Sequence, residues 1–128
     1  WELAADVPCD WAADKATNAA QDYMAQYGDE LKAIICDNDD MSSAAQLACN
    51  EAGREDIVCI GVDGNQGPLA MIKEGTLGAT VLQDGVGQVT AGIDAIKADI
   101  AGETVEKEYT VPFVLVTSEN VDEYLQEG

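Results

Sequence analysis

Three polar residues of this 128-residue sequence have side chains suited to holding a ligand rich in hydroxyl groups. Each follows a short apolar run and precedes the residue expected to cap the next helix: Asn38, Asp63 and Gln83. A carboxylate accepts hydrogen bonds from two neighbouring hydroxyls, and a carboxamide both accepts and donates. These groups match the vicinal hydroxyls of a polyol, so the three residues predict a polyol site if the fold brings them together.

A fourth residue of interest is Trp11, which stands just before the first clear helical pattern. An aromatic face at that position would stack on the C–H face of a pyranose or furanose ring. The alternative is that Trp11 covers the N-terminus of the helix as a hydrophobic staple, and the residue pattern alone slightly favours this alternative. Other acidic residues near the strand ends are expected to cap helices or form turns, namely Asp39, Asp40 and Asp84.

The elements that must position these residues follow from the hydrophobic pattern. Apolar runs predict buried strands, and a further strand is expected near residues 2–7; the runs lie at 33–36, 57–62, 79–82 and 111–116. Between the runs, helical patterns cover residues 12–27 and 40–52 and a shorter stretch that begins near Pro68. The last helical pattern is the clearest, because apolar residues recur at spacings of three and four: Val86, Val89, Ile93, Ile96 and Ile100.

The alternation of strands and helices predicts an α/β fold, with a mainly parallel sheet and helices on both faces. In open sheets of this kind, ligands bind beyond the carboxyl ends of the strands. Asn38, Asp63 and Gln83 are therefore expected on one rim of the sheet. The loop that carries Trp11 would reach the same rim from the strand near residues 2–7.

Composition restricts the classes of function. Six Lys and Arg residues against 25 Asp and Glu give a net charge of −19, which argues against binding to nucleic acids or anionic membranes. The sequence has no His and no C-x-x-C pair among its four cysteines, so we expect no metal site and no cofactor. Catalysis would need a carboxylate pair such as Asp37 and Asp63, which nothing marks as special, so we do not expect an enzyme.

Longer motifs around these residues resemble a known family. The segments AIICDNDDM at 33–41, VCIGVDG at 58–64 and IKEGTLGATVLQ at 72–83 resemble the C-terminal lobe of type I periplasmic sugar-binding proteins, the ribose- and galactose/glucose-binding family. The segment VPFVLVTSEN at 111–120 resembles the final strand of that family, which follows the last hinge crossing. The resemblance covers essentially the whole chain in order.

The resemblance implies roles for the four residues. Asn38, Asp63 and Gln83 match positions at which the family hydrogen-bonds sugar hydroxyls, and Trp11 matches a position that stacks on the sugar ring. Some members hold calcium through a carboxylate where this chain has Lys32, so that metal site is not expected. The implied function is the solute-binding component of a carbohydrate ABC importer, with a monosaccharide and the importer permease as partners. Its implied location is extracellular or periplasmic, with a lipid anchor in a bacterium with a single membrane.

The family pattern also has parts that this sequence does not match. Members carry an N-terminal lobe and an opening strand and helix of the C-terminal lobe, so residues 1–128 are expected to be a fragment of the C-terminal lobe. The opening strand of the family lies between the strands expected near residues 2–7 and 33–37. Its loss would leave unpaired strand edges, so we expect the fragment to need its missing half or to associate with itself.

Two other classes remain as alternatives. The effector-binding core of lactose-repressor-type transcription regulators shares the fold and the rim, and would carry a DNA-binding headpiece upstream. A phosphoacceptor receiver domain has similar length and alternation, with Asp63 as its acceptor and Asp39 and Asp40 as its acidic pair. Receivers need a Lys at the end of the last strand, where this chain has Val116 and Thr117, so this alternative is remote.

Overall fold

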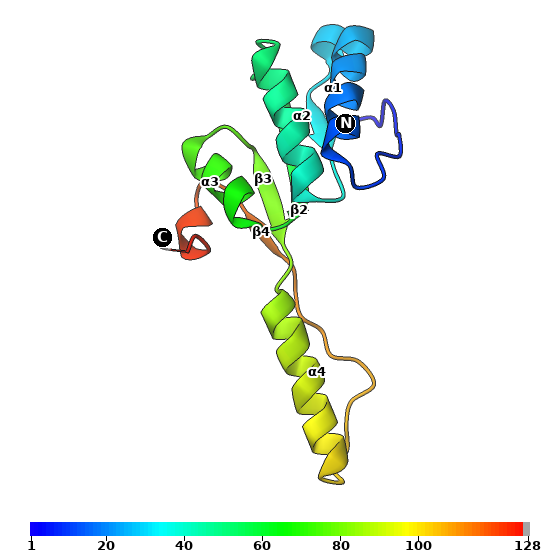
Figure 1. Ribbon diagram of the computed structural model, residues 1–128, viewed down its shortest axis with the longest axis vertical. Helices are drawn as coiled ribbons and strands as arrows, with labels where there is room; N and C mark the ends of the chain where they lie inside the picture. The colour runs from blue at the N-terminus through cyan, green and yellow to red at the C-terminus, as the bar shows by residue number, and fades with distance from the viewer. Residues whose placement is uncertain (127–128) are drawn as a thin grey trace.

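The fold alternates helices and strands along the chain (Figure 1). It is taken from a computed structural model that describes residues 1–126. Two short 3-10 helices accompany the main elements, at Gly28–Glu30 and Val121–Glu123. The main elements are α1 (Ala13–Tyr27), β1 (Ala33–Ile35), α2 (Asp39–Glu51), β2 (Val58–Asp63), α3 (Gln66–Glu74), β3 (Ala79–Leu82), α4 (Gly85–Ile100) and β4 (Val114–Val116).

The four strands form one sheet in the order β1-β2-β3-β4. The first three strands are parallel, and β4 is antiparallel to β3. Residues Ile35 and Ile60 are partners across β1 and β2, and Asp63 and Leu82 are partners across β2 and β3. The carboxyl ends of the parallel strands therefore lie at one edge, as the sequence predicted. The α/β class and the mainly parallel sheet are confirmed.

One face of the sheet packs against α2. Cys49 of α2 and Cys59 of β2 are both fully buried there. Gln46 ties the helix to the strand, because its Nε2 donates to the carbonyl oxygen of Ile57 at 2.9 Å and its Oε1 accepts from the Cys59 N–H at 2.8 Å. The polar side chain thus satisfies backbone groups inside an apolar interface, where an unpaired group would be costly. The resulting core is small and rests on aliphatic and thiol side chains.

Arg54, just after the C-terminal end of α2, contacts the segment that follows α1 and the loop that precedes β2. Its guanidinium donates to the carbonyl oxygens of Gly28 at 2.8 Å and Leu31 at 3.2 Å, just after α1. The same group pairs with Asp56 through two bonds of 2.8 and 3.0 Å. A planar guanidinium can make these contacts at once because its donors form a fixed fork. Arg54 therefore caps the end of α1 from a distant part of the sequence.

The opposite face of the sheet has apolar side chains open to solvent. Ile35 is 80% exposed, Val58 43% and Leu115 58%. The strand register places these residues on the face that points away from α2, because side chains alternate along each strand. Exposed apolar surface of this extent is typical of a surface that another element or chain covers.

Helix α4 projects away from the sheet (Figure 1). Its bounds agree with the sequence pattern, but no residue of α4 is buried. The apolar residues that predicted the helix are all exposed, from 47% at Ile93 to 81% at Ile100. The pattern therefore predicted the helix correctly, yet the surface against which its apolar stripe would pack is not among residues 1–126.

The strand predicted near residues 2–7 is wrong. That segment has no regular secondary structure, and Leu3 and Val7 are 82% and 47% exposed. A strand needs a neighbouring strand to pair with its backbone N–H and C=O groups. Within residues 1–126 the sheet ends at β1, and residues 2–7 pair with no strand. The segment instead lies near α1, where the Tyr27 hydroxyl donates to the carbonyl oxygen of Ala4 at 3.1 Å.

Candidate ligand-binding site

The turn after β2 has the tightest backbone of the site. Asp63 has a φ of 130° and Gly64 a φ of 82°. A Cβ atom at Gly64 would collide with the side chain of Leu82 on the neighbouring strand. Positive φ is unfavourable for a residue with a side chain, and such strained residues gather at functional sites. The glycine is thus required for close strand packing, while Asp63 carries the strain.

Asp63 and Gln83 are held side by side at the ends of β2 and β3. The backbone N–H of Gln83 donates to the carbonyl oxygen of Asp63 at 3.0 Å. The Asp63 carboxylate is partly buried and its Oδ2 accepts a long hydrogen bond of 3.4 Å from Asn65. The Gln83 side chain is exposed, and its Nε2 donates to Gln88 at 3.3 Å. Both side chains keep free hydrogen-bonding capacity at the rim.

Asn38 caps the N-terminus of α2, a role that the sequence interpretation had assigned to a later residue. It is the N-cap of α2, because its Oδ1 accepts from the Met41 N–H at 2.9 Å, and it is only 9% exposed. The expectation that Asn38 precedes the cap is therefore wrong. Its Oδ1 is used by the helix, which leaves the Nδ2 amide as the donor available to a ligand. Asp84 caps α4 as expected, through the Gly87 N–H at 2.8 Å.

Asp39 is the site residue that the sequence interpretation missed. It was expected to cap a helix or form a turn, but it is fully buried and bonds to other elements. Its Oδ1 accepts from the Thr80 hydroxyl at 2.5 Å, and its Oδ2 accepts from the N–H groups of Gly64 and Asn65 at 2.9 Å each. Burial raises the pKa of the Asp39 carboxyl, while these hydrogen bonds oppose that rise. The signals in the sequence were Gly61 and Gly64, which mark close backbone approach.

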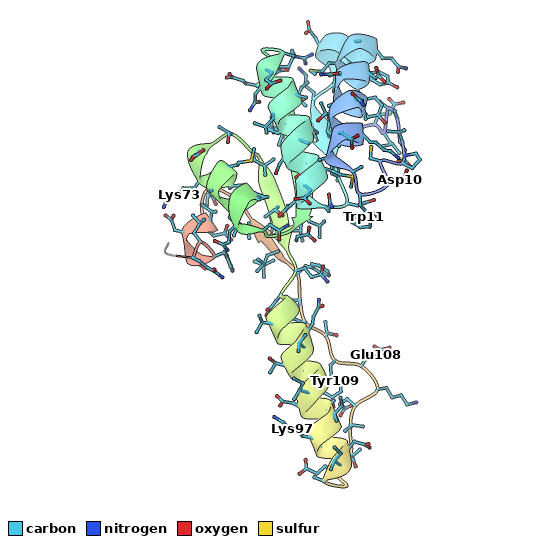
Figure 2. All side chains as sticks on the ribbon, viewed as in Figure 1. Asp10, Trp11, Lys73, Lys97, Glu108 and Tyr109 are labelled. Atoms are coloured by element: carbon cyan, nitrogen blue, oxygen red, sulfur yellow. The ribbon has the colours of Figure 1, made fainter. Side chains whose placement is uncertain are left out.

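Trp11 lies at the same end of the molecule as the N-termini of α2 and α3. It lines a shallow groove with Asp40 of α2 and with Gly67 and Pro68 of α3, and Figure 2 shows it at the lower end of α2. The residue is 67% exposed, and its backbone φ is 60°. An indole that covered the helix N-terminus as a staple would lose more of its surface than this. Trp11 therefore presents an exposed aromatic surface in a groove between α2 and α3, and the residues that line this groove do not include Asn38, Asp63 or Gln83.

Within residues 1–126, no group of three or more His, Cys, Asp or Glu side chains is arranged to hold a metal ion. Over the same residues, no helix combines the length and the apolar character needed to span a bilayer. All four cysteines are free thiols.

Comparison with known proteins assigns the family. The family model described as a periplasmic binding protein domain matches residues 1–104. The chain belongs to this family. A xylitol-binding protein of Mycolicibacterium smegmatis is 32% identical over 112 residues, which cover 88% of this chain and 32% of that protein. A ribose import binding protein of Salmonella typhimurium is 30% identical over 118 residues, covering 91% of this chain and 39% of that protein.

A solved structure gives the same result for the fold. An ABC transporter solute-binding protein from Bacillus halodurans with bound myo-inositol matches with a TM-score of 0.75 and 33% identity, over 88% of this chain and 39% of that one. The resemblance to type I periplasmic sugar-binding proteins is thereby confirmed, and this chain makes up part of a lobe of that type. The chain spans only 32 to 39% of the length of these three proteins.

Proposed function

We propose that residues 1–128 are a fragment of the C-terminal lobe of the solute-binding component of a carbohydrate ABC importer, and that the rim of this fragment binds a monosaccharide or a related polyol. The observation that carries the proposal is the bond between neighbouring strand ends that holds Asp63 beside Gln83, in a chain of this family. Relatives named for xylitol and ribose support a ligand with several hydroxyl groups. The binding is reversible and involves no covalent step.

In this proposal, each of the four side chains makes a different type of contact with the ligand. The Asp63 carboxylate accepts from two neighbouring hydroxyls, and each such charge-assisted bond is worth about 1.5–3 kcal/mol. The Gln83 carboxamide donates and accepts, whereas Asn38 donates through Nδ2 because its Oδ1 already caps α2. Trp11 offers its exposed indole to the apolar face of the sugar ring. Together these groups favour a cyclic polyol with adjacent hydroxyls.

A second lobe completes the site in this proposal. The rim lies on one side of the ligand only, and closure of two lobes around a ligand excludes water from its hydrogen bonds. Helix α4 presents an unpaired apolar stripe away from the sheet, which supports its packing in the other lobe. The loaded protein would then dock on the importer permease. It would act outside the cytoplasmic membrane, with a lipid anchor in a bacterium that has a single membrane.

Isothermal titration calorimetry on the complete two-lobed protein tests the proposal. The probes are xylitol, D-ribose, D-allose and myo-inositol, because three relatives are named for binding the first three and one similar solved structure contains bound myo-inositol. We expect one of them or a close analogue to bind with a Kd in the micromolar range or below. We expect the 128-residue chain alone to bind weakly or undetectably. Low-micromolar binding by the chain alone would contradict the two-lobe part, and a folded complete protein that binds no sugar or polyol would contradict the function.

A further inference from the structure

The buried carboxylate of Asp39 connects the start of α2 with the turn after β2 and with β3. It belongs to the first turn of α2, next to Asn38, and none of its surface is exposed. Its three hydrogen bonds reach Gly64 and Asn65, directly after Asp63, and Thr80, three residues before Gln83. These contacts join positions 25 to 41 residues apart in the sequence. Each expected ligand residue of the sheet rim is thus one to three residues from an atom of this network.

We propose that Asp39 is a positioning residue of the ligand site, which acts by holding Asp63 and the adjoining strand ends in their binding geometry. This inference rests on the proposed function, because it assigns Asp39 a part in that same site. Asp39 does not touch the ligand. It acts through the turn at residues 63–65, whose two N–H groups it fixes.

The strain at Asp63 is the first argument for this role. A φ of 130° is rarely adopted by a residue with a Cβ atom, and it persists only where surrounding contacts determine it. Asp39 supplies such contacts, because its Oδ2 binds the N–H groups of the two residues that follow Asp63. Without the carboxylate, the turn is free to relax and the Asp63 side chain would point elsewhere.

The close approach of α2 to β2 is the second argument. A Cβ atom at Gly61 would collide with Ser42 Oγ and would lie 2.7 Å from Asp39 Oδ1 and 2.9 Å from the carbonyl oxygen of Asn38. A side chain at position 61 would therefore displace the beginning of α2. The missing Cβ of Gly61 thus makes the room in which the carboxylate of Asp39 fits.

The cost of the arrangement is the third argument. A carboxylate taken out of water is unfavourable unless it is fully hydrogen-bonded, and packing alone could be achieved with an apolar residue. Asp39 instead has three donors from two neighbouring segments, while the adjacent Asp40 is exposed in the same helical turn. A buried polar network beside a rim of ligand-binding residues fixes one geometry of that rim.

A double-mutant cycle on ligand affinity tests the proposal in the complete protein, with the probe among xylitol, D-ribose, D-allose and myo-inositol that binds most tightly. We expect Asp39→Ala to weaken binding about tenfold or more. In the Asp63→Ala background, the same change should weaken binding less than about threefold, because the residue it positions is gone. The matched control Glu51→Ala, at an exposed residue of the same helix α2 and with the same charge change, should leave the affinity within about twofold.

A conservative variant separates positioning from charge. In Asp39→Asn, the amide oxygen can still accept from Gly64 and Asn65 while the amide nitrogen donates to the Thr80 hydroxyl. We therefore expect Asp39→Asn to restore the affinity to within about threefold of the wild type. If Asp39→Ala fails to fold, Thr80→Val removes one hydrogen bond to Asp39 with little change in side-chain shape. Thr80→Val should weaken ligand binding in the protein that retains Asp63 but not in the Asp63→Ala variant.

A spectroscopic reading keeps the two proposals distinguishable. In the 1H–15N spectrum of the complete protein, Asp39→Ala should move the amide protons of Gly64 and Asn65 upfield and leave that of Gly87, whose N–H binds Asp84, unchanged. If Asp39→Ala causes these shifts but the wild-type protein binds no sugar, only the proposed function is contradicted. Unchanged Gly64 and Asn65 resonances, or an equal loss of affinity in both backgrounds of the cycle, would overturn the positioning role of Asp39.

Discussion

The N–H of Gln83 lies 3.0 Å from the carbonyl oxygen of Asp63 and donates a hydrogen bond to it. This bond continues the ladder of β2 and β3 one step past the partners Asp63 and Leu82. It commits backbone groups only, so both side chains remain available at the rim. The two residues are 20 positions apart in the sequence (83 − 63), yet the parallel pairing makes them neighbours.

The first prediction concerns the carboxylate of Asp63. In the complete protein, Asp63→Ala should cost about 2 kcal/mol or more of sugar-binding free energy, the scale of lost charge-assisted hydrogen bonds. Folding stability should change little, because Asp63 bonds only weakly to Asn65. Calorimetry and thermal unfolding measure the two effects separately. A sharp fall in melting temperature with unchanged affinity would instead make Asp63 a structural turn residue.

A second substitution at Asp63 should separate stability from binding. Asp63→Gly removes the side chain from a position with a φ of 130°, which glycine adopts without steric strain. We expect the free energy of unfolding to rise by about 1 kcal/mol, since such strain is worth about 1–3 kcal/mol and glycine loses some of that gain through chain entropy. The affinity should fall as in Asp63→Ala. A Gly variant less stable than the Ala variant in urea unfolding would mean that Asp63 is not strained.

The third prediction concerns Gly61. Gly61→Ala should destabilise the fold by about 2 kcal/mol or more, because its Cβ would collide with Ser42 at the start of α2. The matched control is Gly67→Ala in α3, where a Cβ would meet nothing within 4 Å. Alanine is the better helix former, so the control should be neutral or slightly stabilising. Equal stability of the two variants in denaturant unfolding would argue against the close packing of α2 on β2.

The fourth prediction is a pH dependence of stability at Asp56. The guanidinium of Arg54 lowers the pKa of the Asp56 carboxyl from 3.8 to about 2. Because the folded pKa lies below the unfolded one, the ion pair contributes stability above about pH 4 and loses that contribution as the pH falls through about 2. The difference in unfolding free energy between wild type and Asp56→Asn should therefore shrink over this range. In an Arg54→Gln background the same substitution should show a smaller convergence, because the guanidinium that lowers the pKa of Asp56 is gone and only Lys32 remains.

Local patterns predicted the helices and strands well, because each depends on residues close in sequence. The regular apolar spacing up to Ile100 predicted α4 with the bounds that the structure shows. The role of Asp39 could not be predicted in this way, since its partner Thr80 lies 41 residues away and only the folded chain shows that Asp39 is buried. The prediction of a strand near residues 2–7 was wrong for a related reason, because a strand forms only where a neighbouring strand pairs with it.

The fifth prediction concerns the exposed stripe of α4. The double change Ile93→Gln and Ile96→Gln should leave the stability of the 128-residue chain within about 0.5 kcal/mol, because these side chains are 47% and 61% exposed. In the complete protein, the same change should cost about 2 kcal/mol or more if the stripe packs in a second lobe. Lys97→Gln, on the same helix and 73% exposed at its side chain, is the control and should be neutral in both. Equal effects in both proteins would contradict the packing of α4 against another lobe.

The behaviour of the 128-residue chain by itself follows from the free edge of β1 and the open face of the sheet. Ile35 lies on both, 80% exposed, and its strand has no neighbour on one side within the described residues. Unpaired strand edges beside apolar surface pair with other chains, so we expect sedimentation equilibrium to show association that increases with concentration. Ile35→Lys should weaken this association by placing a charge on the edge, whereas the control Leu3→Lys, in the irregular segment before α1, should not. A monomer that melts cooperatively and stays monomeric at all concentrations would show that this edge needs no partner, and that residues 1–128 fold as a unit without the second lobe.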